Sequence, residues 1–116
     1  MRKYCFKKSE HLKKERDFMH VLKIGIRNSD SIMTVYSVPN SLDYNRLGII
    51  VAKKRVKSAV ARNHLKRLIR EAFRLNNSIL LQGFDVIVNI KQIEGLMLND
   101  IATSLLNLLP CYNHKK

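Results

Sequence analysis

The stretch from Ser58 to Leu75 constrains the fold most, because it carries two opposed stripes of side chains at helical spacing. At about 100° per residue, one side of such a helix is apolar. That side holds Ala61, Leu65, Leu68, Ile69 and Ala72, with Phe73 at its boundary. Ser58 suits a helix N-cap, and Asn76-Asn77 can stop a helix. The sequence therefore predicts a helix that needs a second layer to bury its apolar stripe.

The opposite side of this helix is basic or polar. Within about 140° of the helical wheel it carries Arg62, Lys66, Arg70, Asn63, Arg74 and Arg67. A solvated helix face is the simplest interpretation, but such faces usually mix charge signs at i,i+4, whereas here bases repeat at that spacing. A bound polyanion would offset their repulsion, and the abundance of arginine favours RNA or DNA over a membrane.

Composition extends the same argument to the whole chain of 116 residues. Its 22 basic and 9 acidic residues give a formal net charge of +13, while 46% of residues are hydrophobic, so a folded body carries the charge. We expect one RNA-binding domain over 1–116, with 1–16 as a loosely ordered basic arm. The absence of a spanning segment or a secretory signal predicts a cytoplasmic protein with no membrane partner. Cys5 and Cys111 are expected to be reduced thiols.

The remaining segments predict an α+β fold. The expected elements are a helix at 17–25, strands at 31–38 and 47–52 joined as a hairpin by a turn at 40–45, the helix at 58–75, a strand at 85–91 and a helix at 98–109. The order α-β-β-α-β-α favours a two-layer sandwich, a mixed sheet with its helices on one face. The other face would stay partly open for function.

The run LGIIVAKKRVKSAVARNHLKRLIREAFR, residues 47–74, closely resembles the signature of the bacterial ribonuclease P protein family. LKKERDFMHVL resembles that family's first helix, and DVIVNIK resembles its last strand. The resemblance implies a fold like the second domain of ribosomal protein S5. It also implies a left-handed β-α-β crossover, which the general handedness rule would reject.

The resemblance further implies two sets of RNA-binding residues. The helix would bind the catalytic RNA subunit through Arg62, Asn63, His64, Lys66, Arg67, Arg70 and Arg74. A cleft between sheet and first helix would bind the 5′ leader of precursor tRNA through Phe18, Leu22, Tyr36, Lys53, Lys54, Asn89 and Lys91. His64 and Leu22 depart from the usual arginine and aromatic of the family. Phe18 and Tyr36 have ordinary core packing as their alternative role.

The resemblance implies that the chain is the non-catalytic subunit of an endoribonuclease. The RNA would carry the catalytic groups and bind most of the Mg²⁺, while the free protein would be a monomer. From the residues alone, the acids are scattered and no metal-ligand grouping occurs, which agrees with a chain that has no catalytic or metal-binding residue. A structural ribosomal or nucleoid protein is the alternative, and an autonomous nuclease is a third hypothesis.

Overall fold

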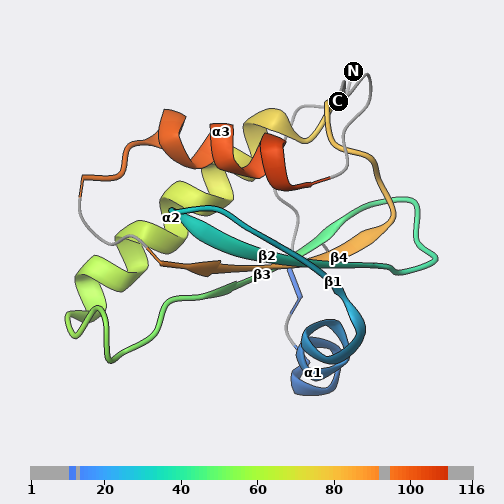
Figure 1. The fold of residues 1–116 in the computed structure, drawn as a ribbon, viewed down its shortest axis with the longest axis horizontal. Coiled ribbons are helices and arrows are strands. Elements are labelled where there is room, and N and C mark those ends of the chain that lie inside the picture. The colour runs from blue at the N-terminus through green and yellow to red at the C-terminus, as the bar shows by residue number, and fades with distance from the viewer. Residues whose placement is uncertain (1–10, 13, 92–94, 110–116) are drawn as a thin grey trace.

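A four-stranded sheet forms the middle layer of the protein, and helices cover both of its faces (Figure 1). The computed structural model describes residues 11–12, 14–91 and 95–109, so both cysteines and residues 1–10 of the predicted 1–16 arm lie outside the described residues. Of the rest of that arm, Leu12 is buried and its amide donates to the Leu47 carbonyl at 2.9 Å. The helices are α1 (Glu15–Ile24), α2 (Ala59–Asn76) and α3 (Leu98–Leu108). The strands are β1 (Ile26–Ser29), β2 (Met33–Pro39), β3 (Arg46–Ile50) and β4 (Phe84–Ile90).

The strands lie in the order β1-β2-β4-β3. β1 and β2 form an antiparallel hairpin, β2 pairs antiparallel with β4, and β3 pairs parallel with β4. The α+β class, the mixed sheet and a β-α-β crossover through α2 are thus confirmed.

Two predictions about the sheet are wrong. The element order is α-β-β-β-α-β-α, because the polar segment Ile26–Ser29 forms β1, an exposed edge strand without an alternating apolar pattern. The predicted hairpin of 31–38 with 47–52 does not form, since β4 lies between β2 and β3 and pairs with both. The partner of β2 in its hairpin is instead β1, through a turn in which the Asp30 carboxylate accepts hydrogen bonds from two backbone amides.

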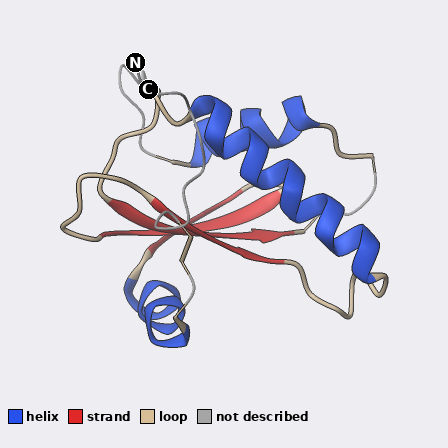
Figure 2. Ribbon diagram, turned by 180° about the vertical axis from the view of Figure 1, so that it is seen from behind, coloured by secondary structure: helices blue, strands red, loops and turns tan. Residues whose placement is uncertain are grey.

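The placement of all helices on one face is also wrong. α2 and α3 cover one face of the sheet, whereas α1 lies across the other (Figure 2). The larger core fills the α2 and α3 side, with Met33, Val88 and Ile101 among its fully buried members. The smaller core joins Val21 of α1 to Ile87 of β4, because α1 has an apolar stripe of its own to bury.

The long helix forms where its pattern predicts. The Ser58 hydroxyl accepts a hydrogen bond from the Ala61 amide at 3.2 Å, which caps the N-terminus of α2. Leu65, Ile69 and Ala72 are buried as expected, but Ala61 is exposed. Phe73 is only 2% exposed, since α3 packs along α2 and extends the apolar stripe to that side. No helix in the described ranges has the length and apolarity needed to cross a membrane.

Candidate nucleic-acid interface

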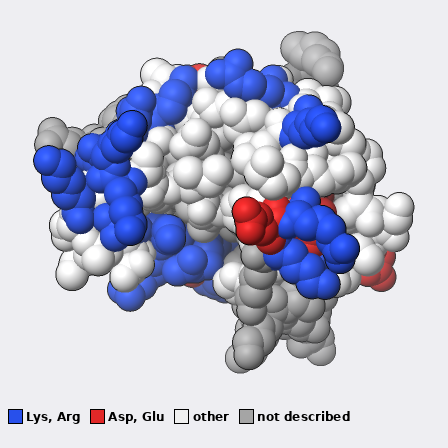
Figure 3. All heavy atoms as spheres, turned by 90° about the horizontal axis from the view of Figure 1, so that it is seen from below, with Lys and Arg blue, Asp and Glu red and all other residues white. Residues whose placement is uncertain are grey.

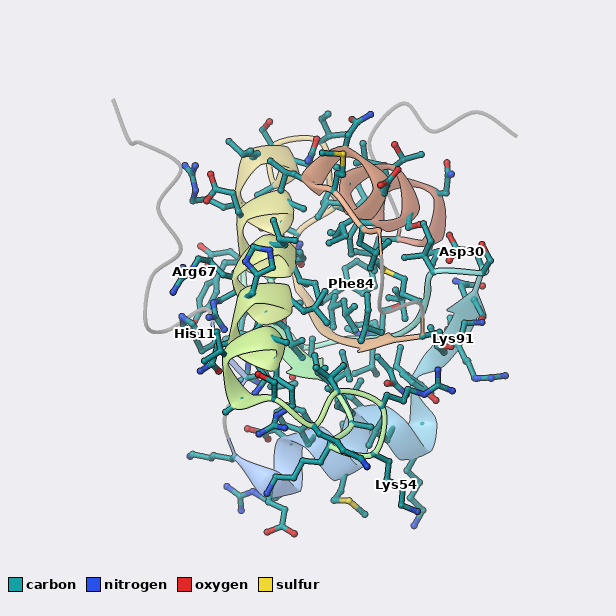
Figure 4. All side chains as sticks on the ribbon, turned by 90° about the vertical axis from the view of Figure 1, so that its left-hand side faces the viewer. His11, Asp30, Lys54, Arg67, Phe84 and Lys91 are labelled. Atoms are coloured by element: carbon teal, nitrogen blue, oxygen red, sulfur yellow. The ribbon has the colours of Figure 1, made fainter. Side chains whose placement is uncertain are left out.

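The outer side of α2 presents the polar residues that the sequence placed there. Asn63, His64 and Arg67 are exposed, while Lys66 and Arg70 are half-buried where α2 approaches the rest of the domain. Figure 4 shows Arg67 and His11 on the same side of α2. The helix therefore brings these predicted residues to one surface, which we call the α2 face.

Both ends of the α2 face are tied to other groups of the protein. The Arg62 guanidinium donates hydrogen bonds to the carbonyls of Val56 and Lys57 at 2.8 and 3.0 Å, so it shapes the loop before α2. Arg62 keeps its charge and further N–H donors for a phosphate. Arg74 Nε donates to Glu71 Oε1 at 3.1 Å, and this bond lowers the pKa of Glu71 below its usual value. The positive field of the α2 face is consequently weaker at Arg74 than the sequence implied.

A second group of bases lies where β3 and β4 end. Parallel strands bring their carboxyl ends to the same edge of a sheet, so the loop after β3 lies close to Lys91 after β4. The Arg55 guanidinium spans them and donates to the Lys91 carbonyl at 2.8 Å. Lys53 and Lys54 of the loop are exposed, and Lys54 lies on the α1 side of the sheet in Figure 4. Arg55 belongs with these lysines, although it was not among the predicted site residues.

The face of the sheet that carries α1 holds the other predicted residues. Tyr36 and Asn89 lie on this face, which we call the α1 face, because they alternate with the residues that point to α2. Phe18 and Leu22 pack there from α1, and these two with Tyr36 are half-buried against the smaller core. The two roles considered for Phe18 and Tyr36 are compatible, since each ring supports the core and stays partly open to solvent.

The bases of the α1 face are unevenly distributed. Figure 3 looks onto this face and shows lysine and arginine side chains gathered toward its left, where Figure 1 has the start of α2 and the loop before it. Lys91 Nζ donates to the Ser29 hydroxyl at 2.8 Å, which holds this lysine beside β1. Arg27 of β1 lies opposite Tyr36 in register and is exposed. Sequence reasoning missed Arg27, because no strand was expected there.

An ion-pair network fixes the other end of the α1 face. Arg46 donates to both carboxylate oxygens of Asp85, at 2.8 and 2.7 Å, and its guanidinium lies 3.8 Å from Asp17 of α1. Asp85 is only 5% exposed, and its hydrogen bond raises the pKa of Arg46 above the usual value. The network ties α1 to β3 and β4, so its role is to position the α1 face.

Close packing fixes the position of Phe18. An ideal Cβ built on Gly48 would lie 2.5 Å from Phe18 Cζ, far inside van der Waals contact. Only glycine leaves room there for the ring, which explains a glycine in the interior of a strand. The isolated glycine in the LGIIVA run was the available sequence signal, because such a residue often marks a close approach.

The described part of the chain does not fit a resident Mg²⁺ site. In these ranges no three His, Cys, Asp or Glu side chains group closely enough to hold a metal ion. Burial acts to raise the pKa of Asp30, but hydrogen bonds from the Met33 amide, the Ser104 hydroxyl and the Ile32 amide, with the Lys91 charge, outweigh it and lower the pKa. This carboxylate, like those of Asp85 and Glu71, is already engaged within the protein.

Comparison with known proteins gives one consistent result. A family model described as Ribonuclease P matches residues 6–113. The ribonuclease P protein component of Petrotoga mobilis is 36% identical over 109 residues, which are 90% of this chain and 92% of the relative. That of Chromobacterium violaceum is 40% identical over 91 residues, 78% of this chain and 74% of the relative.

Solved structures of the same kind of protein superpose well. The ribonuclease P protein of Thermotoga maritima gives a TM-score of 0.78 at 36% identity, covering 86% of this chain and 94% of its own. The ribonuclease P protein of Staphylococcus aureus gives 0.76 at 36% identity, covering 87% and 93%. The likeness therefore extends through the fold as well as through the sequence.

Proposed function

Because the chain belongs to the ribonuclease P protein family, we propose that its α2 face binds the catalytic RNA subunit and its α1 face binds the 5′ leader of precursor tRNA. The chain is the protein subunit of ribonuclease P, a tRNA-processing ribonuclease. The alternative of a structural ribosomal or nucleoid protein has no support from the comparisons.

The observation that carries the proposal is the exposure of the α2 face. Arg67 and Asn63 project from a helix whose opposite side is locked into the main core, so the polar side can meet a rigid partner without unfolding the helix. Guanidinium groups make paired hydrogen bonds to phosphate oxygens, and helical spacing sets several of them along one line. A structured RNA surface carries closely spaced phosphates with which this row of guanidinium groups can pair.

The α1 face has the features that suit a single strand. Tyr36 and Phe18 offer partly open rings on which bases can stack, while Lys53 and Lys54 provide charge for the backbone. Asn89 lies next to Ile50 and Thr34 in register and adds a polar group to the same face. Stacking tolerates many base sequences, which fits a leader that differs from one precursor to another.

We assign the catalytic groups to the RNA subunit, which would also bind most of the Mg²⁺. The carboxylates of Asp85 and Glu71 are engaged with arginines, and this supports a chain that contributes binding rather than proton transfer. The protein would neutralise phosphate repulsion and hold the precursor in place. The free protein is expected to be a monomer.

Reconstitution with the cognate RNA subunit tests the proposal. Arg67→Ala should weaken assembly of the holoenzyme by about tenfold, the effect of losing one charge-assisted hydrogen-bond group. Lys23→Ala is the matched control, because Lys23 is an exposed base in the last turn of α1, away from the α2 face. Equal effects of the two substitutions would refute a specific role for the α2 face. Cleavage of precursor tRNA with Mg²⁺ but without the RNA subunit would refute the assignment of catalysis.

A further inference from the structure

A hollow lies between α1, β3 and α2, where the α1 face meets the α2 face. Its lining includes Phe18 of α1, Gly48 and Ile49 of β3, and Lys66 and Arg70 of α2. Its volume of about 150 Å³ is well above the roughly 10 to 15 Å³ that one water molecule requires. The hollow can therefore admit part of a larger ligand.

Two cations of α2 line this hollow without a counter-charge. Lys66 and Arg70 are one helical turn apart and half-buried, and neither has a hydrogen-bond or ion-pair partner within the ranges that the structure describes. Like charges at i,i+4 repel, and partial burial removes some of the water that would screen them. Glu71, the acid of α2, is turned to Arg74. An anion from outside the protein would relieve this repulsion.

The aromatic ring of Phe18 narrows the class of anion. Gly48 allows the ring to lie against β3, so the ring and the two cations line the same hollow. A nucleotide combines a phosphate with a ribose and a base that can contact an aromatic side chain. Inorganic phosphate would neutralise the cations but would make no contact with the open part of the ring, which already packs on the smaller core.

We propose that this hollow is a single-nucleotide subsite, in which Lys66 and Arg70 bind the phosphate of an RNA strand and Phe18 contacts its base or ribose. The proposal rests on the proposed function and changes how that function assigns residues to the two RNA-binding sets. Phe18 belonged to the leader set and Lys66 and Arg70 to the catalytic-RNA set, whereas here they share one nucleotide. Gly48 becomes a positioning residue, because it seats the ring.

A double-mutant cycle on the reconstituted holoenzyme tests the shared subsite. Phe18→Leu removes the ring but keeps an apolar side chain in the core, and Lys66→Ala removes one cation. Residues that hold one ligand are energetically coupled, so the double variant should weaken precursor binding at least about threefold less than the product of the single effects. Phe18→Leu with Arg67→Ala is the control pair, because Arg67 does not line the hollow, and its effects should multiply.

Parallel arms identify the strand that supplies the nucleotide. Coupling with leader-bearing precursor tRNA, but not with the RNA subunit alone, assigns the nucleotide to the leader. Coupling with the RNA subunit alone assigns it to the catalytic RNA. Multiplicative effects in both arms would overturn the inference while leaving the proposed function intact. If none of the single substitutions weakens binding, Arg67→Ala included, the proposed function itself would be refuted.

Titration of the free chain gives an independent readout. Uridine 5′-monophosphate should shift the backbone amide signals of Gly48 and Ile49 in NMR spectra, and it should bind more tightly than inorganic phosphate. Lys66→Ala should reduce both affinities, whereas Phe18→Leu should reduce only that for the nucleotide. Equal affinities for the two ligands, or no shift at Gly48, would contradict a nucleotide subsite.

Discussion

Replacing Gly48 with alanine should displace the Phe18 ring and so disturb the packing of α1 against the sheet. The added Cβ would lie 2.5 Å from Cζ of Phe18 and 3.0 and 3.1 Å from its two Cε atoms. The ring has to move, because the clash involves three of its atoms at once. Overpacking of this kind costs about 1 to 3 kcal/mol. We expect Gly48→Ala to lower the free energy of unfolding by that amount.

Urea unfolding of Gly48→Ala, Phe18→Leu and the double variant measures this effect. A smaller side chain at position 18 gives the new methyl group room, so the double variant should be more stable than the sum of the single losses predicts. Precursor binding by the holoenzyme should weaken in Gly48→Ala, since the ring is displaced from the α1 face. A loss below about 0.5 kcal/mol, the range of ordinary surface substitutions, would refute the packing argument.

Three further predictions each concern a single residue. Asp85→Ala leaves the partly buried Arg46 with only the 3.8 Å contact to Asp17, and urea unfolding should show a loss of about 3 kcal/mol; a loss below 1 kcal/mol would contradict it. The pKa of Asp30 is lowered in the folded state, so its stabilising charge is fully present above pH 3.8 and is lost as the pH falls through the folded value. Asp30→Asn should therefore destabilise the protein at pH 7 and lose that effect as the pH falls below the folded value, and a difference in unfolding free energy that stays constant down the acid range would be evidence against this linkage. His64→Arg should tighten binding to the cognate RNA at low salt and steepen the salt dependence by about 0.7 to 0.9 in log-log slope, whereas equal or weaker affinity would overturn the prediction.

The helix α2 could be predicted because its information is local. Its apolar and basic stripes repeat at helical spacing, and Ser58 caps it through its own hydroxyl. The positions of the candidate binding residues on this helix then follow from helical geometry, while their binding role stays a prediction. Arg74 is the exception, because its pairing with Glu71 depends on the side-chain conformations that the two residues adopt.

The arrangement of the strands could not be read from the same signals. β1 is short, polar and exposed, so its identity depends on pairing with β2 rather than on its own residues. The position of β4 between β2 and β3 is set by long-range contacts, and strand propensity does not identify the partner of a strand. The apolar stripe of α1 was visible, but the pattern did not say which face of the sheet it would cover.

The hollow was hidden for a related reason. Phe18 and Lys66 are far apart in the sequence and come from helices on opposite faces of the sheet. They approach each other only around β3, at the end of the strand order, where Gly48 leaves space for the ring. Because the sequence analysis assigned these residues to two separate sites, on the long helix and in the cleft, it could not show that the two sites adjoin.

The most direct test of the central claim is the salt dependence of binding between this protein and its RNA subunit. Arg62, Lys66, Arg67 and Arg70 are the cations of the α2 face that no described carboxylate neutralises. If these cations neutralise four phosphates, or three where Lys66 and Arg70 share one, they give a log-log slope of about −2.1 to −3.6. Arg67→Ala should reduce its magnitude by about 0.7 to 0.9, while Lys23→Ala leaves it unchanged. A nearly flat dependence, or a slope that Arg67→Ala does not alter, would contradict an RNA-binding α2 face.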